Sequence, residues 1–247
     1  MLSTVHFILQ GKGGVGKSVV AALLAQYLHD KNMTVRCVDA DPLNKTLAGF
    51  EALKVAKVDL LEKSERGGER INPHRFDELV ELIAAQGADS HVIVDAGSSA
   101  FIALVHYIVT NEVVAVLTKS GHEVIVHTLV TGGQMLRDTL HGAYQLVGQI
   151  EGVRFVVWLN PFLGPVAADG KTFEQMKAYQ DVKKRIEAVI SLPAFTDELF
   201  PGDIASMLAD RLTFKEAIGS PAFTLMSRHR LTKAQSEFYS CLDSLAV

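Results

Sequence analysis

The part of this chain best equipped for chemistry is the segment GKGGVGKS, which runs from Gly11 to Ser18. It satisfies the phosphate-loop pattern G-x-x-x-x-G-K-[ST] in full. In such a loop, backbone N–H groups turn towards phosphate oxygens, and the start of the following helix adds partial positive charge. We expect Lys17 to reach the β- and γ-phosphates of a nucleotide and Ser18 to bind Mg²⁺. The alternative is a glycine-rich turn with incidental lysines. The residues expected at the nucleotide are Gly11, Lys12, Gly13, Gly14, Val15, Gly16, Lys17, Ser18 and Val19.

A carboxylate is also needed on the metal side of such a site. The segment HVIVDAG places Asp95 at the end of an apolar, strand-like run, where it fits the aspartate that supports Mg²⁺ in phosphate-loop proteins. Gly97 follows two residues later, and its N–H could contact the γ-phosphate. The alternative for Asp95 is an aspartate that caps the next helix.

Two further acids, Asp39 and Asp41, lie in the segment VDADP at 38–42. They follow another apolar run, at the strand end where open α/β sheets bind ligands. Two carboxylates this close to phosphate would repel it unless metal or water lay between. We therefore assign Asp41 to the attacking water, and Asp39 either to the Mg²⁺ shell or to orienting the loop. The alternative for both is a polar turn before Pro42.

The base of the nucleotide is expected to be adenine. A guanine site needs an aspartate, and the segment LTKSG at 117–121 offers only the lysine of such a motif. Asn160, at the end of an apolar run, could offer its amide to the adenine edge, and Pro193 could form part of an apolar wall. Asn160 could equally be a turn residue before Pro161.

The elements that must position these residues follow an alternating pattern. Runs of strand length lie at 4–9, 34–38, 91–94, 113–117, 153–158 and 187–192. Helical patterns lie at 17–31, 75–86, 99–109, 123–141 and 172–185, with two more near 202–218 and 227–245. Strands that are apolar on both faces and alternate with helices predict an α/β fold, a mostly parallel twisted sheet with helices on both faces. The apolar stretch 100–117 is read as helix, turn and strand, because TNE at 110–112 interrupts it.

Composition agrees with one globular α/β domain over residues 1–247. Hydrophobic residues make up 48% and charged residues 21%, and the net charge is −4, so no overall basic field draws the chain onto nucleic acid. The two cysteines, Cys37 and Cys241, suit a reducing cytoplasm, and Cys37 is read as a core residue. The first residues, MLSTVHFILQ, show no signal peptide, so a cytoplasmic location is expected. The histidines show no metal-ligand spacing.

The order of these motifs resembles the MinD and ParA superfamily of ATPases. Their loop, K-G-G-x-G-K-[ST], matches KGGVGKS here, and DADP and VIVDAG resemble their two acidic motifs. In that superfamily the first lysine of the loop crosses an ATP-bound dimer and touches the partner's phosphates. The resemblance implies ATP and Mg²⁺ as cofactors, an ATP-dependent homodimer, and a catalytic role in trans for Lys12. Lys12 could instead counter phosphate charge in its own subunit.

A closer likeness covers most of the chain. DAGSSAFIALVHYI, VHTLVTGGQMLRDTL, VVWLNPFLGP and DIASMLADRLTFKEA resemble the TraL proteins of conjugative plasmids, which implies a role in conjugative transfer and partners in the transfer machinery. A partition or positioning ATPase that binds DNA or membrane is the alternative, and a metabolic phosphate-loop enzyme is a third. The basic residues of 171–185 could meet DNA, although a solvated helix face is favoured. The final helix has basic residues only at its start, so we expect it to pack within the fold or a dimer.

Overall fold

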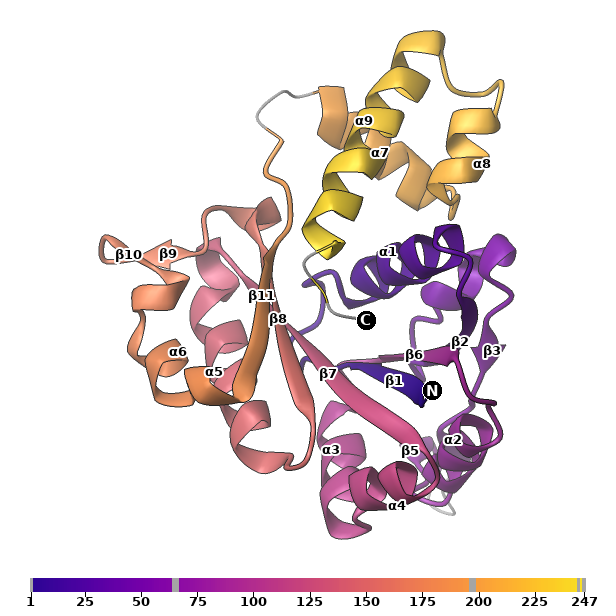
Figure 1. The fold of residues 1–247 in the computed structure, drawn as a ribbon, viewed down its shortest axis with the longest axis vertical. Coiled ribbons are helices and arrows are strands. Elements are labelled where there is room, and N and C mark those ends of the chain that lie inside the picture. Colours follow the sequence, from indigo (N-terminus) through magenta and orange to yellow (C-terminus); the bar gives the residue numbers. More distant parts are fainter. Residues whose placement is uncertain (1, 64–66, 196–198, 244, 246–247) are drawn as a thin grey trace.

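Seven parallel strands form the central sheet in the computed structural model, which describes residues 2–63, 67–195, 199–243 and 245 (Figure 1). Their order is β11-β8-β7-β1-β6-β2-β3, and every neighbouring pair is parallel. The strands are β1 (Ser3–Ile8), β2 (Thr34–Ala40), β3 (Ala56–Lys57), β6 (Ser90–Ala96), β7 (His122–Thr131), β8 (Arg154–Asn160) and β11 (Ile186–Ser191). The predicted α/β fold with a parallel sheet is therefore confirmed.

Helices cover both faces of the sheet, and each face has its own core. On one face α1 packs over Ile8, Ile93 and Ile125, which alternate with the residues of the other face. On the opposite face α2, α3 and α4 pack over a core that includes Phe7 and Val94. The helices of the sheet region are α1 (Lys17–Asp30), α2 (Arg75–Ala84), α3 (Phe101–Thr110), α4 (Val113–Lys119), α5 (Leu136–Gln149) and α6 (Lys177–Val182).

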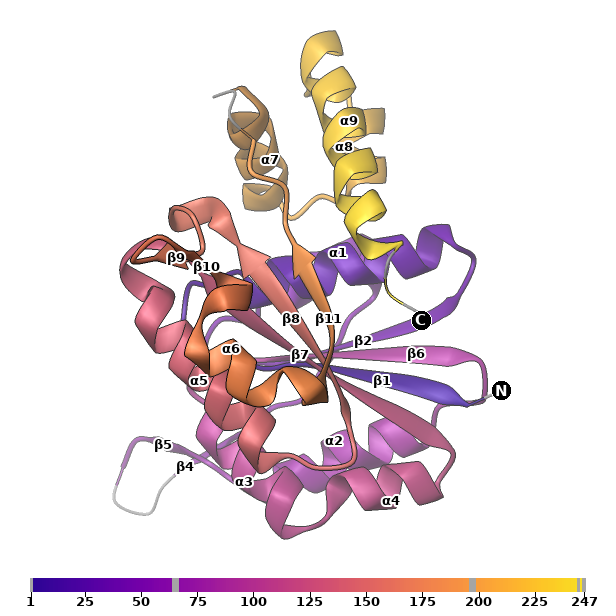
Figure 2. The ribbon, with the colours of Figure 1, turned by 60° about the vertical axis from the view of Figure 1, so that its left-hand side comes forward.

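The last three helices form a lobe on the α1 side of the sheet (Figures 1 and 2). They are α7 (Leu199–Ala209), α8 (Phe214–Gly219) and α9 (Leu225–Leu242). The Tyr239 ring of α9 meets the Tyr27 ring of α1 edge-on, with centroids 5.4 Å apart. As expected for a packing helix, the apolar residues along one side of this segment are buried: Leu231, Phe238, Leu242 and Leu245. Whether residues 1–247 act as a single domain stays a prediction.

The sequence prediction was wrong between residues 113 and 131. The segment 113–117, predicted as a strand, is the helix α4, and the predicted helix 123–141 is the strand β7 followed by α5. In α4, Val113 and Leu117 are buried while Val116 is exposed, which is the spacing of a helix. A short apolar run fits a strand and a buried helix equally well, so its periodicity could not distinguish between the two structures. The left-handed Gly121 ends the turn before β7.

Two other segments also differ from the prediction. Residues 62–72, for which no helix or strand was predicted, contain most of a hairpin of β4 (Leu61–Lys63) and β5 (Glu69–Ile71), seen at the lower left of Figure 2. The predicted helix 172–185 is an α-helix only in α6, with 3-10 turns at Phe173–Gln175 and Lys183–Arg185 on either side. A second hairpin, β9 (Ala167–Ala168) with β10 (Lys171–Thr172), precedes these turns. Within the described ranges no single helix has the length and apolar character to cross a membrane; α3 and α4 meet those criteria only together, with a bend of 61°.

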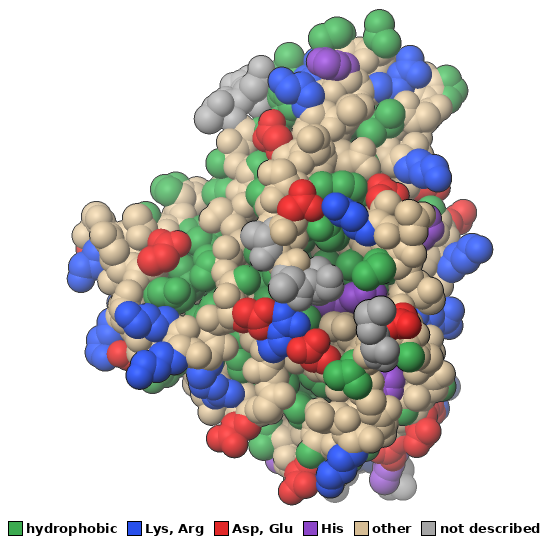
Figure 3. Space-filling model, viewed as in Figure 1, with side chains coloured by type: hydrophobic (Ala, Val, Ile, Leu, Met, Phe, Trp, Pro, Cys, Tyr) green, Lys and Arg blue, Asp and Glu red, His purple; other side chains and the backbone are tan. Residues whose placement is uncertain are grey.

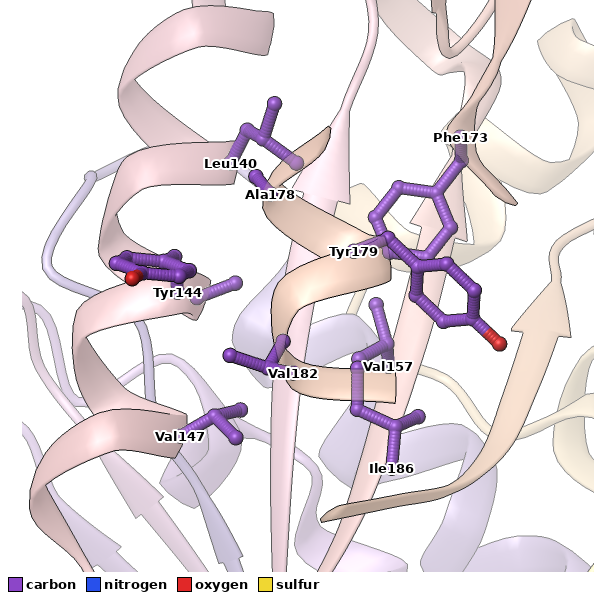
Figure 4. A pocket seen from close by; sticks show the side chains of 10 residues that line it. Leu140, Tyr144, Val147, Val157, Phe173, Ala178, Tyr179, Val182 and Ile186 are labelled. Carbon is purple, nitrogen blue, oxygen red and sulfur yellow. The ribbon is translucent and has the colours of Figure 1, made fainter. Parts of the chain in front are cut away.

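Apolar side chains join α5 to α6 and to the sheet, and this packing fixes α5 beside the carboxyl end of β7. Figure 4 shows the side chains that line this contact, among them Leu140, Tyr144 and Val147 of α5 and Tyr179 and Val182 of α6. The cavity left between them is about 10 Å³, which is no larger than one water molecule needs. It is therefore a small packing defect and offers no room for a nucleotide.

A hydrogen-bonded row of aromatic rings crosses the core on the α1 face. Nε1 of Trp158 donates to Nδ1 of His127 (3.0 Å), Nε2 of His127 lies 2.9 Å from Nδ1 of His6, and Nε2 of His6 lies 3.1 Å from Nδ1 of His91. All four side chains are buried. An indole N–H can only donate, so each histidine in turn must accept at Nδ1 and carry its proton on Nε2. Four neighbouring strands, β8, β7, β1 and β6, are thereby linked.

Candidate nucleotide-binding site

The carboxyl ends of the parallel strands bring most of the predicted site residues together. The phosphate loop connects β1 to α1, Asp95 lies in β6, and Asp39 lies opposite Asp95 in the neighbouring β2. On the other side of β1, Asn160 ends β8. Ligands of open α/β sheets bind at this edge. The roles of these residues stay predictions.

The phosphate loop begins α1 directly. Gly16 adopts a left-handed conformation, with φ 98°, immediately before Lys17, and no side chain caps the helix start, so the first N–H groups of α1 point into the loop. Val15 is buried and Val19 is half-buried; they anchor the loop in the cores beneath it, while Gly11, Gly13 and Gly14 are exposed on its surface. This arrangement is a cradle for anionic phosphate.

Lys17 lies inside that cradle. Its side chain is largely buried, and its ammonium donates to the carbonyl oxygen of Lys12 (3.1 Å), across the loop. Burial lowers the pKa of Lys17, while Asp95 and Asp41 act in the opposite direction. Within the described ranges no carboxylate contacts this buried ammonium directly, and such a group is suited to a phosphate.

Asp95 is the residue whose surroundings most strongly suit a cation. It is 1% exposed, and among the described residues neither of its carboxylate oxygens has a hydrogen-bond partner of ordinary geometry. Burial raises the pKa of Asp95 to about 7, and the nearby Ser18 hydroxyl and Lys17 ammonium oppose that increase. A buried carboxylate without a partner is costly, and Mg²⁺ prefers oxygen ligands. The residues at this position therefore fit a Mg²⁺ ion held by Ser18, with Asp95 behind it.

Asp39 and Asp41 differ in what they contact. The two Asp39 oxygens accept hydrogen bonds from the backbone N–H groups of Asp41 (3.0 Å) and Ala48 (2.8 Å), so this carboxylate orients the loop after β2. Burial raises the pKa of Asp39. Asp41 lies nearer the surface and faces Gly97: a Cβ at Gly97 would collide with its carboxyl group. Asp41, predicted to orient the attacking water, and Gly97, predicted to contact the γ-phosphate, are thus adjacent.

The residues predicted for the base lie at the far side of the loop. The Asn160 amide donates to the carbonyl of Val15 (2.9 Å), and its oxygen accepts from the N–H of Phe162 (3.1 Å). Asn160 therefore supports the phosphate loop and shapes the next turn, and its contact with adenine stays a prediction. Pro193 is half-buried, two residues beyond β11, the strand next to β8.

Lys12 projects from the loop towards α5. Its ammonium contacts Asp138 at 2.7 Å, and the two side chains are 41% and 57% exposed. The hydrogen bond from Lys12 lowers the pKa of Asp138. Sequence reasoning missed Asp138 because it was read as part of the last turn of a helix over 123–141, whereas α5 begins at Leu136 and places Asp138 in its first turn.

Gln10 was also missed. It is 1% exposed and stands between β1 and the phosphate loop, and its amide contacts β7, α5 and the loop. The signal was a polar residue directly after an apolar strand, where burial requires hydrogen-bond partners.

Comparison with known proteins agrees with the fold and the loop. Residues 6–192 match the family described as CobQ/CobB/MinD/ParA nucleotide binding domain. A protein named TraL from Escherichia coli is 45% identical over 247 residues, which is 100% of both chains. Among solved structures, MinD from Aquifex aeolicus has a TM-score of 0.53 with 17% identity, covering 99% of this chain and 98% of that one. The MinC:MinD complex of Aquifex aeolicus gives 0.55 with 14% identity, over 99% and 97%.

The family match extends from β1 to just beyond β11 and contains the phosphate loop, the acidic strand ends and Asn160. The chain therefore belongs to the CobQ/CobB/MinD/ParA nucleotide-binding domain family and, within it, to the TraL proteins.

Proposed function

We propose that this protein is a Mg²⁺-dependent ATPase that is switched by ATP between monomer and dimer and supports plasmid conjugative transfer. The observation that carries the nucleotide chemistry is the buried Asp95 at a complete phosphate loop: among the described residues its carboxylate accepts no hydrogen bond of ordinary geometry, and the Ser18 hydroxyl and Lys17 ammonium lie nearby. A cation and a triphosphate would satisfy all three groups together.

Each residue has a separate part in this proposal. Lys17 and the loop N–H groups bind the β- and γ-phosphates, and Ser18 holds Mg²⁺ with Asp95 behind it. The metal supplies charge neutralisation when it is bound. Asp41 orients a water molecule towards the γ-phosphate, and Gly97 leaves the room for that geometry because any side chain there would displace Asp41. Positioning of this kind accounts for most of the catalysis in phosphoryl transfer.

The proposed dimer would form through the surface at the carboxyl edge of the sheet. Two large apolar side chains are highly exposed close to the loop: Ile102, 79% exposed, and Phe162, 80% exposed. Ile102 follows Phe101, whose ring limits the space at Gly11 of the loop. Phe162 donates its backbone N–H to the side chain of Asn160, which supports the loop. Exposed apolar residues around a site suit a protein interface. Lys12 would leave Asp138 and reach the γ-phosphate of the partner's nucleotide, as an arginine finger does.

The transfer role is proposed from the 45% identity to TraL over the whole chain.

Direct DNA binding is not favoured. In the basic region 171–185, Lys177 is paired with Asp181 at 2.7 Å, and Arg185 donates to the carbonyls of Val147 and Ile150. Figure 3 shows several blue side chains and only a few red ones over α6, and the contacts just named engage part of this basic charge. Retention on DNA that requires ATP and weakens with salt would favour the partition alternative.

Lys17→Ala tests the placement of the site. The loop would lose the ammonium in its centre, so ATP binding measured by calorimetry should fall below detection. Lys31→Ala is a matched control, because Lys31 follows the other end of α1 and contacts Asp243. Binding by Lys17→Ala with the affinity of the wild type would show that the site lies elsewhere.

A further inference from the structure

The amide of Gln10 links three segments of the site that are distant in sequence. Its Nε2 donates to the carbonyl of Leu129 in β7 (2.7 Å) and to the carbonyl of Thr139 in α5 (3.1 Å). Its Oε1 accepts from the backbone N–H of Lys12 in the phosphate loop (3.4 Å). Both amide hydrogens and the oxygen are therefore engaged.

The contact with α5 lies next to the residue that holds Lys12. Thr139 directly follows Asp138, whose carboxylate meets the Lys12 ammonium at 2.7 Å. Thr139 is itself fixed, because its hydroxyl accepts from the N–H of Thr131 at the end of β7 (3.2 Å) and donates to the carbonyl of Met135 (2.9 Å). The first turn of α5 is thus attached to the sheet by Thr139 and to the phosphate loop by Gln10.

We propose that Gln10 is a positioning residue: it holds the backbone of Lys12 to the first turn of α5 and so sets the Lys12 side chain against Asp138. The inference rests on the proposed function, in which Lys12 must move from Asp138 to a phosphate. Gln10 touches neither phosphate nor metal; it acts through Lys12. Nucleotide affinity is carried by Lys17 and the later loop residues, so loss of Gln10 affects hydrolysis more than binding.

A glycine pair in α5 allows a test without mutating Gln10 itself. A Cβ at Gly142 would lie 2.5 Å from Oε1 of Gln10, so Gly142→Ala pushes the carboxamide out of place. A Cβ at Gly148, on the same helix, would meet nothing within 4 Å, so Gly148→Ala is the matched control. Both substitutions favour the helix itself. Gln10→Met removes the same hydrogen bonds by replacing the carboxamide itself, while it keeps the length of the side chain.

The first readout does not depend on activity. Acetylation of Lys12 by an amine-reactive ester, followed by mass spectrometry, reports how firmly Asp138 holds the ammonium. We expect Gln10→Met and Gly142→Ala to raise the labelling rate of Lys12 about threefold or more, which is the size expected when an exposed ion pair such as Lys12–Asp138 is broken. Asp138→Asn should raise the labelling rate by the same amount. Gly148→Ala should label as the wild type does.

The second readout separates positioning from stability. Gln10→Met and Gly142→Ala should lower kcat by about 10-fold to 100-fold, because small displacements of a positioned group cost that much. Their ATP affinity, measured by calorimetry, should stay within about threefold of the wild type. Gly148→Ala should keep both values.

One outcome would overturn the inference, and another would overturn the proposed function instead. It fails if Gly142→Ala equals Gly148→Ala in both Lys12 labelling and kcat, even when Gln10→Met is impaired, because displacement of the same carboxamide would then have no consequence. If the wild type hydrolyses no ATP, the proposed function fails instead, and the labelling of Lys12 alone supports or contradicts the role of Gln10.

Discussion

Mild acidification should destabilise this protein through the row of buried rings formed by Trp158, His127, His6 and His91. Every junction in the row already holds one hydrogen, and the indole N–H of Trp158 cannot change direction. A further proton on any imidazole would therefore place two hydrogens in one junction. Burial lowers the pKa of His127 to about 3 and, together with the neighbouring imidazoles, the pKa of His6 well below its usual value; Arg154 adds to both effects.

The sign and size of the effect follow from proton linkage. Above pH 6.5 these histidines are neutral in both the folded and the unfolded chain and contribute no pH dependence. Below pH 6.5 the unfolded chain takes up protons that the folded chain excludes, so stability falls as the pH falls. Each excluded proton lowers the free energy of unfolding by about 1.4 kcal/mol per pH unit below 6.5, which is about 2 kcal/mol at pH 5. His6 and His127 together therefore lower it by about 4 kcal/mol at pH 5. That is a large part of the stability of an ordinary domain.

Urea unfolding between pH 7 and pH 5 measures this loss, with the fluorescence of Trp158, the single tryptophan, as the signal. His6→Asn should reduce the stability lost between pH 6.5 and pH 5 by about 2 kcal/mol, because one excluded proton is removed. His29→Gln is the control, since His29 is exposed, and it should leave the pH dependence unchanged. If the wild type, His6→Asn and His29→Gln all lost the same stability between pH 6.5 and pH 5, the reasoning would be refuted.

Two further predictions concern the chemistry of the site. Asp41→Ala should bind ATP and Mg²⁺ but hydrolyse ATP about 100-fold or more slowly, whereas Asp95→Ala should require more Mg²⁺; single-turnover assays across a Mg²⁺ titration separate the two, and normal turnover in Asp41→Ala would discard its assignment. Gly97→Ala should bind ATP yet hydrolyse it poorly, because its Cβ would displace Asp41, while Gly87→Ala, with open space around it, should behave as the wild type; equal rates in both variants would contradict the geometry.

The sequence was sufficient for the architecture wherever a local signal and a pattern agreed. The phosphate loop is a continuous motif between a strand and a helix, so its position did not depend on distant contacts. Asp39, Asp41, Asp95 and Asn160 were expected near the phosphate loop because parallel strands present their carboxyl ends at one edge, and the structure places them there. These assignments used chain order alone.

What the sequence could not provide were contacts set by the neighbours of each element. The segment 113–117 is as apolar as a central strand, and only its packing makes it α4. That error moved the start of α5, so Asp138 was not recognised as the partner of Lys12. The contacts of Gln10 and of the histidine row join segments far apart in sequence, and local patterns carry no information about such contacts.

The direct test of the central claim is whether Lys12 acts in the partner subunit. Light scattering should show a dimer with ATP and a monomer with ADP, and Lys12→Ala should bind ATP without forming the dimer. Lys12→Ala is then mixed with Asp41→Ala, each inactive alone. In a mixed dimer, the site on the Lys12→Ala chain keeps Asp41 and receives Lys12 from its partner, so ATP hydrolysis should return at that one site. If no mixing ratio restores hydrolysis although mixed dimers form, Lys12 acts within its own subunit and the proposed switch is wrong.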